Sequence, residues 1–185
     1  MAVEVLPAVS RFDDFATVVG PKTGSRGCWC MAYRNSALGM AERIRYMQGV
    51  CASEPGPGVL AYVDGQPAGW CSIAPRSSYR RLTRSRTIPH IGDGDPWAAV
   101  CFVVRTGYRK RGLMHDLLDG AVEHARSHSA TVVEGYPADT SGGRIDVTSG
   151  YVGTVALFES HGFERALQTS GQSGHRPRWL MRRSL

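Results

Sequence analysis

The sequence predicts one mixed α/β domain, because it combines a hairpin signal with a strand followed by a long helix. Asp64-Gly65 separates the apolar runs Val59–Val63 and Ala68–Ala74 and supplies the positive φ angles of a tight hairpin turn. Trp97–Val104 is almost entirely apolar, which is typical of a central strand buried on both faces. Arg111–His128 follows it with apolar residues on one helical face.

The N-terminal part predicts a strand, two helices and two loops. Val3–Val9 alternates weakly and indicates a strand that ends at Pro7 or soon after. We expect Ser10 to cap a helix that runs to Val19, followed by a loop over Gly20–Gly27. Apolar residues at near-helical spacing predict a second helix over Ser36–Val50, ended by the turn residues Glu54–Gly58.

The C-terminal part alternates strands with connections. Pro75–Pro96 is polar and without periodicity, and a connection of this length in a compact domain usually has a functional role, so we expect a substrate loop. The remaining predicted elements are a strand over Thr131–Tyr136, a loop over Ala138–Gly150, a helix over Val152–His161, a strand opened by Gly162-Phe163 and a last strand over Arg178–Arg182.

Composition limits the function classes. The chain has 185 residues, of which 42% are hydrophobic and 21% charged, so we expect one globular domain over residues 1–185. No apolar run approaches the roughly 20 residues needed to cross a bilayer, and the N-terminus lacks a secretory pattern, which favours a cytoplasmic protein without a membrane partner. The net charge of +6 favours anionic partners.

The five cysteines predict reduced thiols in the core, because their number is odd and no secretory context accompanies them. Cys28 and Cys30 have C-x-C spacing, and no second Cys/His pair lies at finger spacing. A tetrahedral metal site needs four such ligands, so we expect no metal.

The segment from 102 to 118 carries the chemistry: a buried strand, a polar turn and an amphipathic helix. The first amides of such a helix have no internal partner and point to one place, where a pyrophosphate fits. Gly112 allows an anion close to the main chain, and Arg109 adds positive charge. The segment matches neither a Walker loop nor a dinucleotide fingerprint.

This segment resembles the acetyl-CoA-binding signature of the GCN5-related N-acetyltransferase (GNAT) superfamily, an apolar strand with V-x-P-x-Y-R followed by R/Q-x-x-G-x-G/A. Arg109 and Gly112 match the signature, whereas Thr106 stands where proline is common and Met114 where a small residue is usual. Ala156–Glu164 (ALFESHGFE) resembles a second family segment, A-x-x-L-Y-x-x-x-G-F. The resemblance covers roughly residues 59 to 183.

The resemblance implies a GNAT fold: a mixed, mostly antiparallel central sheet that is splayed at the cofactor slot and flanked by helices. It implies that acetyl-CoA is the cosubstrate and that an amine attacks the acetyl group directly. Its pyrophosphate would lie on the backbone of the turn, and its pantetheine would pair with the strand. The implied binding residues are Arg109, Lys110, Arg111, Gly112, Leu113 and Met114 in the turn and Phe102, Val103 and Val104 in the strand.

The sequence departs from the family at the proton-transfer positions. The acceptor ammonium must lose a proton and the departing thiolate should gain one. Phe158 occupies the position where the family often has a proton-donating tyrosine, and the start of the central strand offers no carboxylate. Glu134 and Tyr136 project to one face of the next strand and are our candidates for base and acid; the alternative is a paired strand glutamate and a core tyrosine.

Weaker catalytic candidates are His90, Asp93 and Asp95 in the long loop. Cys101 is more simply a buried apolar thiol than a nucleophile, and His115 an exposed helical histidine rather than a phosphate ligand.

The predicted function is acetyl transfer from acetyl-CoA to a primary amine of a small molecule or protein. The acceptor would be selected by Pro75–Pro96, Cys28–Arg34 and the loop at 138–150. The alternative is a catalytically weak acyl-CoA-binding module. A nucleic-acid-binding protein that uses Arg80–Arg86 is less favoured, because no recognition motif accompanies the arginines. The sequence leaves a homodimer open.

Overall fold

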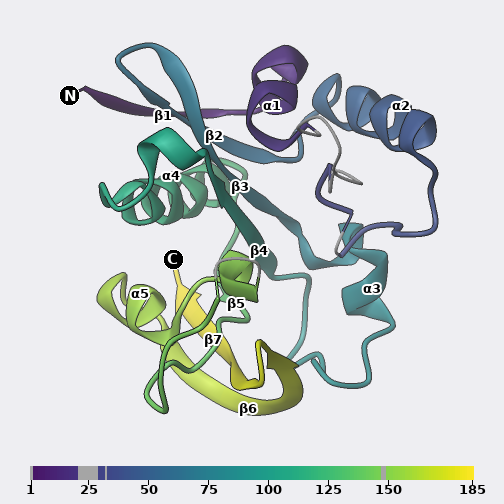
Figure 1. Cartoon of the computed structure of the whole chain (residues 1–185). Helices are drawn as coiled ribbons and strands as arrows, with labels where there is room; N and C mark the ends of the chain where they lie inside the picture. The colour runs from purple at the N-terminus through teal and green to yellow at the C-terminus, as the bar shows by residue number, and fades with distance from the viewer. Residues whose placement is uncertain (1, 21–28, 32, 147–148) are drawn as a thin grey trace.

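Seven strands form one sheet in the order β1-β2-β3-β4-β5-β7-β6 (Figure 1). The computed structural model describes residues 2–20, 29–31, 33–146 and 149–185. Only the neighbours β4 and β5 run parallel, which confirms the predicted mixed, mostly antiparallel sheet. The strands are β1 (Val3–Pro7), β2 (Gly58–Val63), β3 (Gln66–Pro75), β4 (Trp97–Val104), β5 (Val132–Gly135), β6 (Glu164–Ser173) and β7 (Arg176–Ser184).

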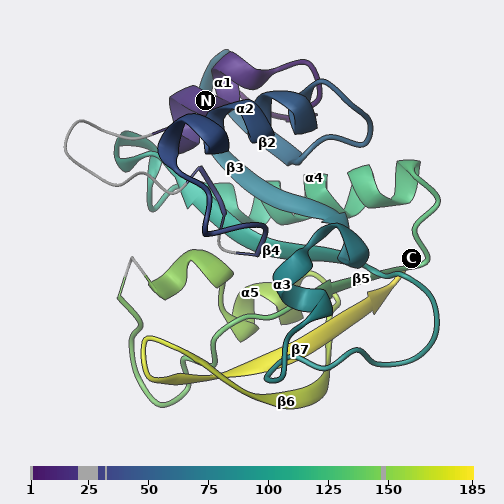
Figure 2. The same cartoon turned by 90° about the vertical axis from the view of Figure 1, so that its right-hand side faces the viewer.

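Helices cover both faces of the sheet (Figure 1 and Figure 2). On one face lie α1 (Phe12–Val19), α2 (Met40–Cys51) and α3 (Arg80–Thr83), and on the other α4 (Leu113–Ser127) and α5 (Val155–Ser160). Each face has its own core, the first around Phe15 and Trp70 and the second around Leu117 and Phe158. Among the described residues, no helix is both long enough and apolar enough to cross a membrane.

The predicted hairpin is confirmed. β2 and β3 pair antiparallel up to Val63 and Gln66, and the turn between them has positive φ at Asp64 (48°) and Gly65 (77°). The backbone thus adopts the conformation that Asp-Gly tolerates and most residues do not.

The expected helix boundaries in the N-terminal part need correction. Ser10 does not cap α1, because its own backbone is left-handed (φ 58°) and its N–H donates to the carbonyl of Cys51 at 2.7 Å. α2 begins at Met40 rather than Ser36, where the N–H of Gly39 donates to Glu42 Oε2 at 2.8 Å. The expected loop over Gly20–Gly27 lies outside the described residues except for Gly20.

Pro75–Pro96 contains regular structure that its sequence does not predict: the 3-10 turn η1 (Arg76–Ser78) and the helix α3. Short polar helices give no periodic signal, yet Tyr79 and Leu82 are buried in the core and fix this segment to the sheet. Tyr79, which follows η1, and Leu82 in α3 thus anchor both short helices.

The expected helix over Val152–His161 is divided. The 3-10 turn η3 (Ser149–Val152) and α5 are separated by Gly153, whose φ is 78°, and by Thr154, the N-cap of α5. The C-terminal strands β6 and β7 are longer than expected, because they pair with each other beyond the apolar positions. β7 also pairs with β5, so that β7 lies between β5 and the edge strand β6.

β4 and β5 part after three residue pairs. Trp97, Ala98 and Ala99 pair with β5, and the pairing ends at Ala99 and Gly135. Directly after Ala99, the register of β4 against β3 shifts by one residue, so that Val100 is extra. A bulge of this kind bends a strand, and from Val100 onward no described strand lies on the β5 side of β4.

Gly135 leaves room for Phe158 where the strands part. A Cβ at Gly135 would overlap the Phe158 ring, which is fully buried and packs edge-on against Phe102 and Phe163. We therefore expect Gly135→Ala to lower the free energy of unfolding by about 1–3 kcal/mol, the usual cost of overpacking. Chemical denaturation monitors this loss.

Gly49→Ala is the matched control, because Gly49 lies inside α2 and the space that an added methyl group would occupy there is open. This substitution should leave stability unchanged or raise it by up to about 1 kcal/mol. Equal stability of wild type and Gly135→Ala would contradict the packing described for Phe158.

Candidate active site

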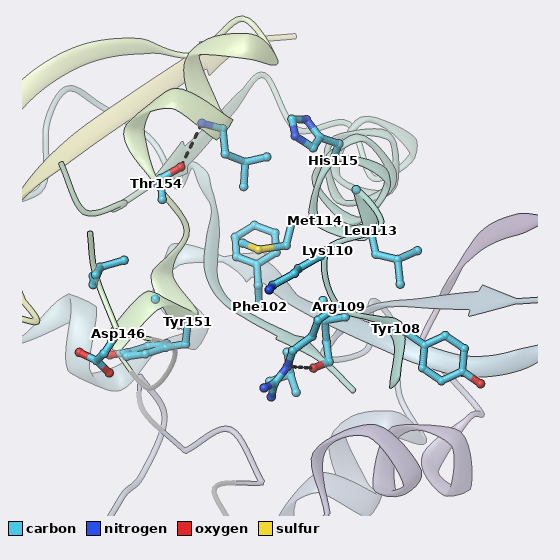
Figure 3. A pocket seen from close by; sticks show the side chains of 16 residues that line it. Phe102, Tyr108, Arg109, Lys110, Leu113, Met114, His115, Asp146, Tyr151 and Thr154 are labelled. Atoms are coloured by element: carbon cyan, nitrogen blue, oxygen red, sulfur yellow. Dashed lines mark hydrogen bonds between the residues drawn. The ribbon is translucent and has the colours of Figure 1, made fainter. Parts of the chain in front are cut away.

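A cavity of about 560 Å³ opens where β4 leaves β5 (Figure 3). One wall is the C-terminal half of β4 with the turn that follows it and the start of α4. The other wall is formed by Ile145, Asp146, Gly150, Tyr151, Thr154 and Leu157. Of the nine residues expected to bind the cofactor, Arg111 alone does not line it; its guanidinium lies 5.9 Å from the centre of the Tyr108 ring. The other eight line the cavity: Phe102, Val103, Val104, Arg109, Lys110, Gly112, Leu113 and Met114.

The turn before α4 has features that suit an anion. Gly112 is the N-cap residue, has φ 82°, and offers no side chain to the amides of the first helical turn. The space where its Cβ would stand is open, so a ligand can approach the main chain there. Lys110 lies beside it, and Arg109 Nε donates to the carbonyl of Val104 at 3.0 Å, which holds this guanidinium at the end of β4.

The walls beyond this turn are mostly apolar. Phe102, Val103 and Val104 come from β4, and Leu157 comes from α5 on the opposite side. Thr154 caps α5 by accepting the Leu157 N–H at 3.3 Å. The open edge of β4 runs along this corridor, so backbone amides and carbonyls can pair with an extended ligand.

Two of the described tyrosines line the cavity: Tyr108 in the turn after β4, and Tyr151 at the wall opposite β4. Tyr151 comes from η3, and Figure 3 shows it beside Asp146, across the cavity from Phe102 and Arg109. Burial raises the pKa of Tyr151 well above its ordinary range, although the guanidinium of Arg178 acts in the other direction. Sequence reasoning missed this residue, because it stands at the end of a loop just before the expected helix and no periodic pattern includes it.

Glu134 and Tyr136 lie together but do not line this cavity. Tyr136 Oη donates to Glu134 Oε2 at 2.9 Å, and both side chains are almost completely buried on the face covered by α1–α3. Arg76 Nε and Arg182 Nε lie 3.6 and 3.3 Å from the Glu134 carboxylate. Burial raises the pKa of Glu134, opposed by the Tyr136 hydrogen bond and then by both guanidiniums.

The weaker candidates have different surroundings. His90 and Asp93 are exposed, whereas Asp95 accepts hydrogen bonds from the backbone and hydroxyl of Ser77 and so ties the long segment together. Cys101 is a buried thiol, as expected for a core cysteine, and Cys28 lies outside the described residues.

His115 lines the cavity at the start of α4. Its Nδ1 is 2.9 Å from His161 Nε2, and His161 Nδ1 is 2.5 Å from Asp119 Oδ1. This chain of polar contacts joins α4 to the end of α5 and holds the His115 ring at the rim of the cavity. Sequence alone treats His161 as a helix end, and it does stand there, as the C-cap of α5.

A family model described as the acetyltransferase (GNAT) family matches residues 29–163. The chain belongs to the GNAT family of acetyltransferases. The match includes β4, the turn at Gly112, α4 and α5, and thus the whole cavity lining. It confirms the resemblance found in the sequence.

Solved structures share the fold over the full length of the chain. Ribosomal-protein-alanine N-acetyltransferase from Brucella melitensis is 17% identical with a TM-score of 0.55, and each chain is covered completely. The mosquito arylalkylamine N-acetyltransferase like 5b is 12% identical with a TM-score of 0.58, again with complete coverage of both. The yncA structure from Salmonella typhimurium with its cofactor acetyl-CoA is 12% identical with a TM-score of 0.53, and the alignment covers 100% of this chain and 95% of the yncA chain. No curated protein matches the chain significantly.

Proposed function

We propose that this GNAT-family protein transfers an acetyl group from acetyl-CoA to a primary amine of a small molecule or protein. The observation that carries the proposal is the order of features along one cavity. An uncapped helix start with Gly112, Arg109 and Lys110 leads into an apolar corridor beside an open strand edge. This order suits a diphosphate followed by a long chain with two amides.

The residues at the turn fit the diphosphate. The first amides of α4 point outward, two cations lie next to them, and the left-handed Gly112 leaves the approach open. Among the described lining residues, the single carboxylate, Asp146, belongs to the opposite wall (Figure 3). The edge of Val103 and Val104 suits the pantetheine amides. The yncA protein, which shares this fold, has acetyl-CoA as its cofactor, and this supports the same ligand here.

Acetyl-CoA supplies the acetyl group as a thioester. The amine nitrogen forms a bond to the acetyl carbon, the carbon–sulfur bond breaks, the amine loses one proton and the sulfur gains one. A backbone N–H near Val103 would donate to the acetyl oxygen while negative charge develops on it. Phe158 cannot donate a proton, so we propose that the Tyr151 hydroxyl protonates the sulfur.

Glu134 stays our proposal for the base that takes the proton of the acceptor, whereas Tyr151 replaces Tyr136 as the proposed acid because Tyr151 lines the cavity and Tyr136 does not. Glu134 is the single carboxylate in the sequences of β4 and β5, and it stands one residue before these strands part. Because both side chains are buried and neither lines the cavity, the proton would reach Glu134 through water, while the Tyr136 hydroxyl donates to the carboxylate. The alternative role is structural, as the anchor of Arg76 and Arg182.

Titration calorimetry with acetyl-CoA, followed by thiol release over a panel of primary amines, tests the function. We expect binding of acetyl-CoA and thiol release that depends on an amine. Binding without release for any amine would favour the acyl-CoA-binding module, and lack of binding would overturn both assignments. A DNA or RNA affinity that falls steeply with salt would instead support nucleic-acid binding through Arg80–Arg86.

Gly112→Ala should weaken acetyl-CoA binding at least about tenfold. The alanine methyl group enters the space in front of the helix amides, where the ligand would lie. The left-handed backbone also costs a residue with a side chain roughly 1–2 kcal/mol, which favours a turn that no longer presents these amides. Calorimetry measures the change. Gly107→Ala is the control in the same turn, because its φ is not left-handed and its Cβ meets nothing. Equal losses of affinity in both variants would argue against diphosphate binding by the backbone amides at Gly112.

Tyr151→Phe should lower kcat by about 100-fold and leave acetyl-CoA affinity unchanged, because general acid catalysis contributes at least this much. Burial raises the pKa of Tyr151, so the hydroxyl keeps its proton through the neutral range and the loss should not vary with pH. Steady-state kinetics at several pH values provide the measurement. Tyr46→Phe on the exposed side of α2 is the control, and an unchanged kcat in Tyr151→Phe would exclude the donor role.

Glu134→Gln should remove an acidic limb from the pH profile of kcat. Protonated Glu134 cannot accept a proton, and burial raises its pKa, so the wild-type rate should rise with pH above the ordinary range of a glutamate. Glu159→Gln, at an exposed ion pair with Arg165, is the control. An unchanged profile in folded Glu134→Gln, with folding checked at each pH, would assign Glu134 the structural role alone.

A further inference from the structure

Arg178 is a buried cation without a carboxylate partner. It lies in β7 with 6% of its surface exposed. Its Nε donates to the carbonyl of Tyr136 at 2.8 Å, whereas its buried Nη2 has no hydrogen-bond partner among the described residues. No described carboxylate lies within 4.0 Å of its guanidinium, and the residues outside the described ranges include no Asp or Glu.

The other buried or partly buried arginines on this side of the sheet have other partners. Arg76 and Arg182 both face the carboxylate of Glu134. Arg34, which likewise has no described carboxylate within 4.0 Å, donates from both Nη atoms to the Ser72 hydroxyl and to backbone carbonyls. Arginine does not lose its charge at any accessible pH, and a buried charge without a counter-ion is costly. The Tyr33 ring, 5.8 Å from the Arg178 Cζ, and the Tyr136 carbonyl offset part of this cost but leave Nη2 unused.

The position of Arg178 connects it to the proposed reaction. Tyr136, whose carbonyl it holds, directly follows Gly135, the last β5 residue that pairs with β4. Neither Arg178 nor Tyr136 lines the cavity itself, but the guanidinium holds the chain at the point where β4 and β5 part. Its charge also opposes the effect of burial on the pKa of Tyr151, which lines the cavity wall, and so acts electrostatically on the proposed proton donor.

The anion that Arg178 lacks does not come from the phosphates of the cosubstrate. Those phosphates fit the amides at Gly112 together with Arg109 and Lys110, at the far end of β4 from the paired residues Trp97–Ala99. The thioester end of the corridor points toward the parting of the strands, and so toward the acceptor side. An anionic group near Arg178 therefore belongs to the acceptor.

We propose that Arg178 binds a carboxylate of the acceptor, so that the preferred acceptors are primary amines that also carry a carboxylate. The inference rests on the proposed acetyl transfer and names its substrate class. A carboxylate accepts from guanidinium N–H groups in their own plane, and such charge-assisted bonds are stronger than neutral ones. The unpartnered Nη2 donates one of these bonds. The excess positive charge around Glu134 also favours an anionic ligand.

The test compares amines that differ in the anionic group alone. 5-Aminopentanoate and pentylamine have similar amine basicity and chain length, and the shorter pair 3-aminopropanoate and propylamine varies the distance between amine and carboxylate. We expect kcat/KM in the wild type to be at least about tenfold higher for one of the carboxylates than for its alkylamine, because a hydrogen bond to a charged group is worth that much. Aminoalkyl phosphonates and sulfonates of equal length distinguish a carboxylate site from a general anion site, and a preference for either over the carboxylate would overturn the assignment.

Arg178→Gln should abolish this preference while acetyl-CoA affinity stays within about twofold of the wild type. Arg176→Gln is the matched control, since Arg176 lies two residues earlier on β7 and donates to the carbonyl of Gly142 instead. Equal rates for carboxylate and alkylamine in the wild type would overturn the inference, and so would a preference that persists in Arg178→Gln. If this variant does not fold, the wild-type comparison decides alone.

A binding measurement separates this inference from the proposed function. 5-Aminopentanoate is titrated into protein saturated with CoA and into protein without it, and the melting temperature is recorded for wild type and Arg178→Gln. Stabilisation that needs Arg178, without any acetyl-CoA binding, would retain the carboxylate site and refute acetyl transfer. Acetyl-CoA turnover only with amines that lack a carboxylate would retain acetyl transfer and refute the carboxylate site.

Discussion

The separation of β4 from β5 is the constraint on which the site depends. Parallel strands would normally continue to pair, but the extra residue at Val100 turns β4 aside directly after Ala99. Gly135 and Phe158 complete the separation, because the missing side chain of one admits the ring of the other between the diverging segments. The result is a strand edge on which no described strand pairs, and this edge leads to a helix start without a side-chain cap.

The two sides of the sheet divide the chemistry. The side of α4 offers main-chain amides and exposed cations, which suit a flexible polyanion. The side of α1–α3 offers buried arginines, a buried glutamate and phenols, which fix the direction of smaller groups. Since β4 lies between the two faces, a ligand group near the bulge at Val100 would be close to both environments.

Local signals in the sequence predict the elements with strong periodicity or turn chemistry. Asp64-Gly65, the apolar run of β4 and the amphipathic face of α4 each act within a few residues, and the structure contains all three. Gly112 and Arg109 could likewise be predicted as site residues, because they belong to the turn between β4 and α4, and both line the cavity. Tyr151 and Arg178 could not, because their positions depend on β5, η3 and β7 meeting at one place, and no spacing within a single segment encodes this. The same holds for Glu134, whose arginine partners come from the distant positions 76 and 182.

Because β4 and β5 pair over only three residues, a bound ligand would also affect how the two halves of the sheet are held together. Three rungs of backbone pairing join β1–β4 to the hairpin of β6 and β7, which reaches the rest of the sheet through β5. A chain-like molecule lying in the corridor would act as an eighth strand, inserted where the ladder is interrupted. Occupancy would thereby brace the two halves of the sheet against each other, and the shape of the acceptor side would depend on what the cosubstrate side holds.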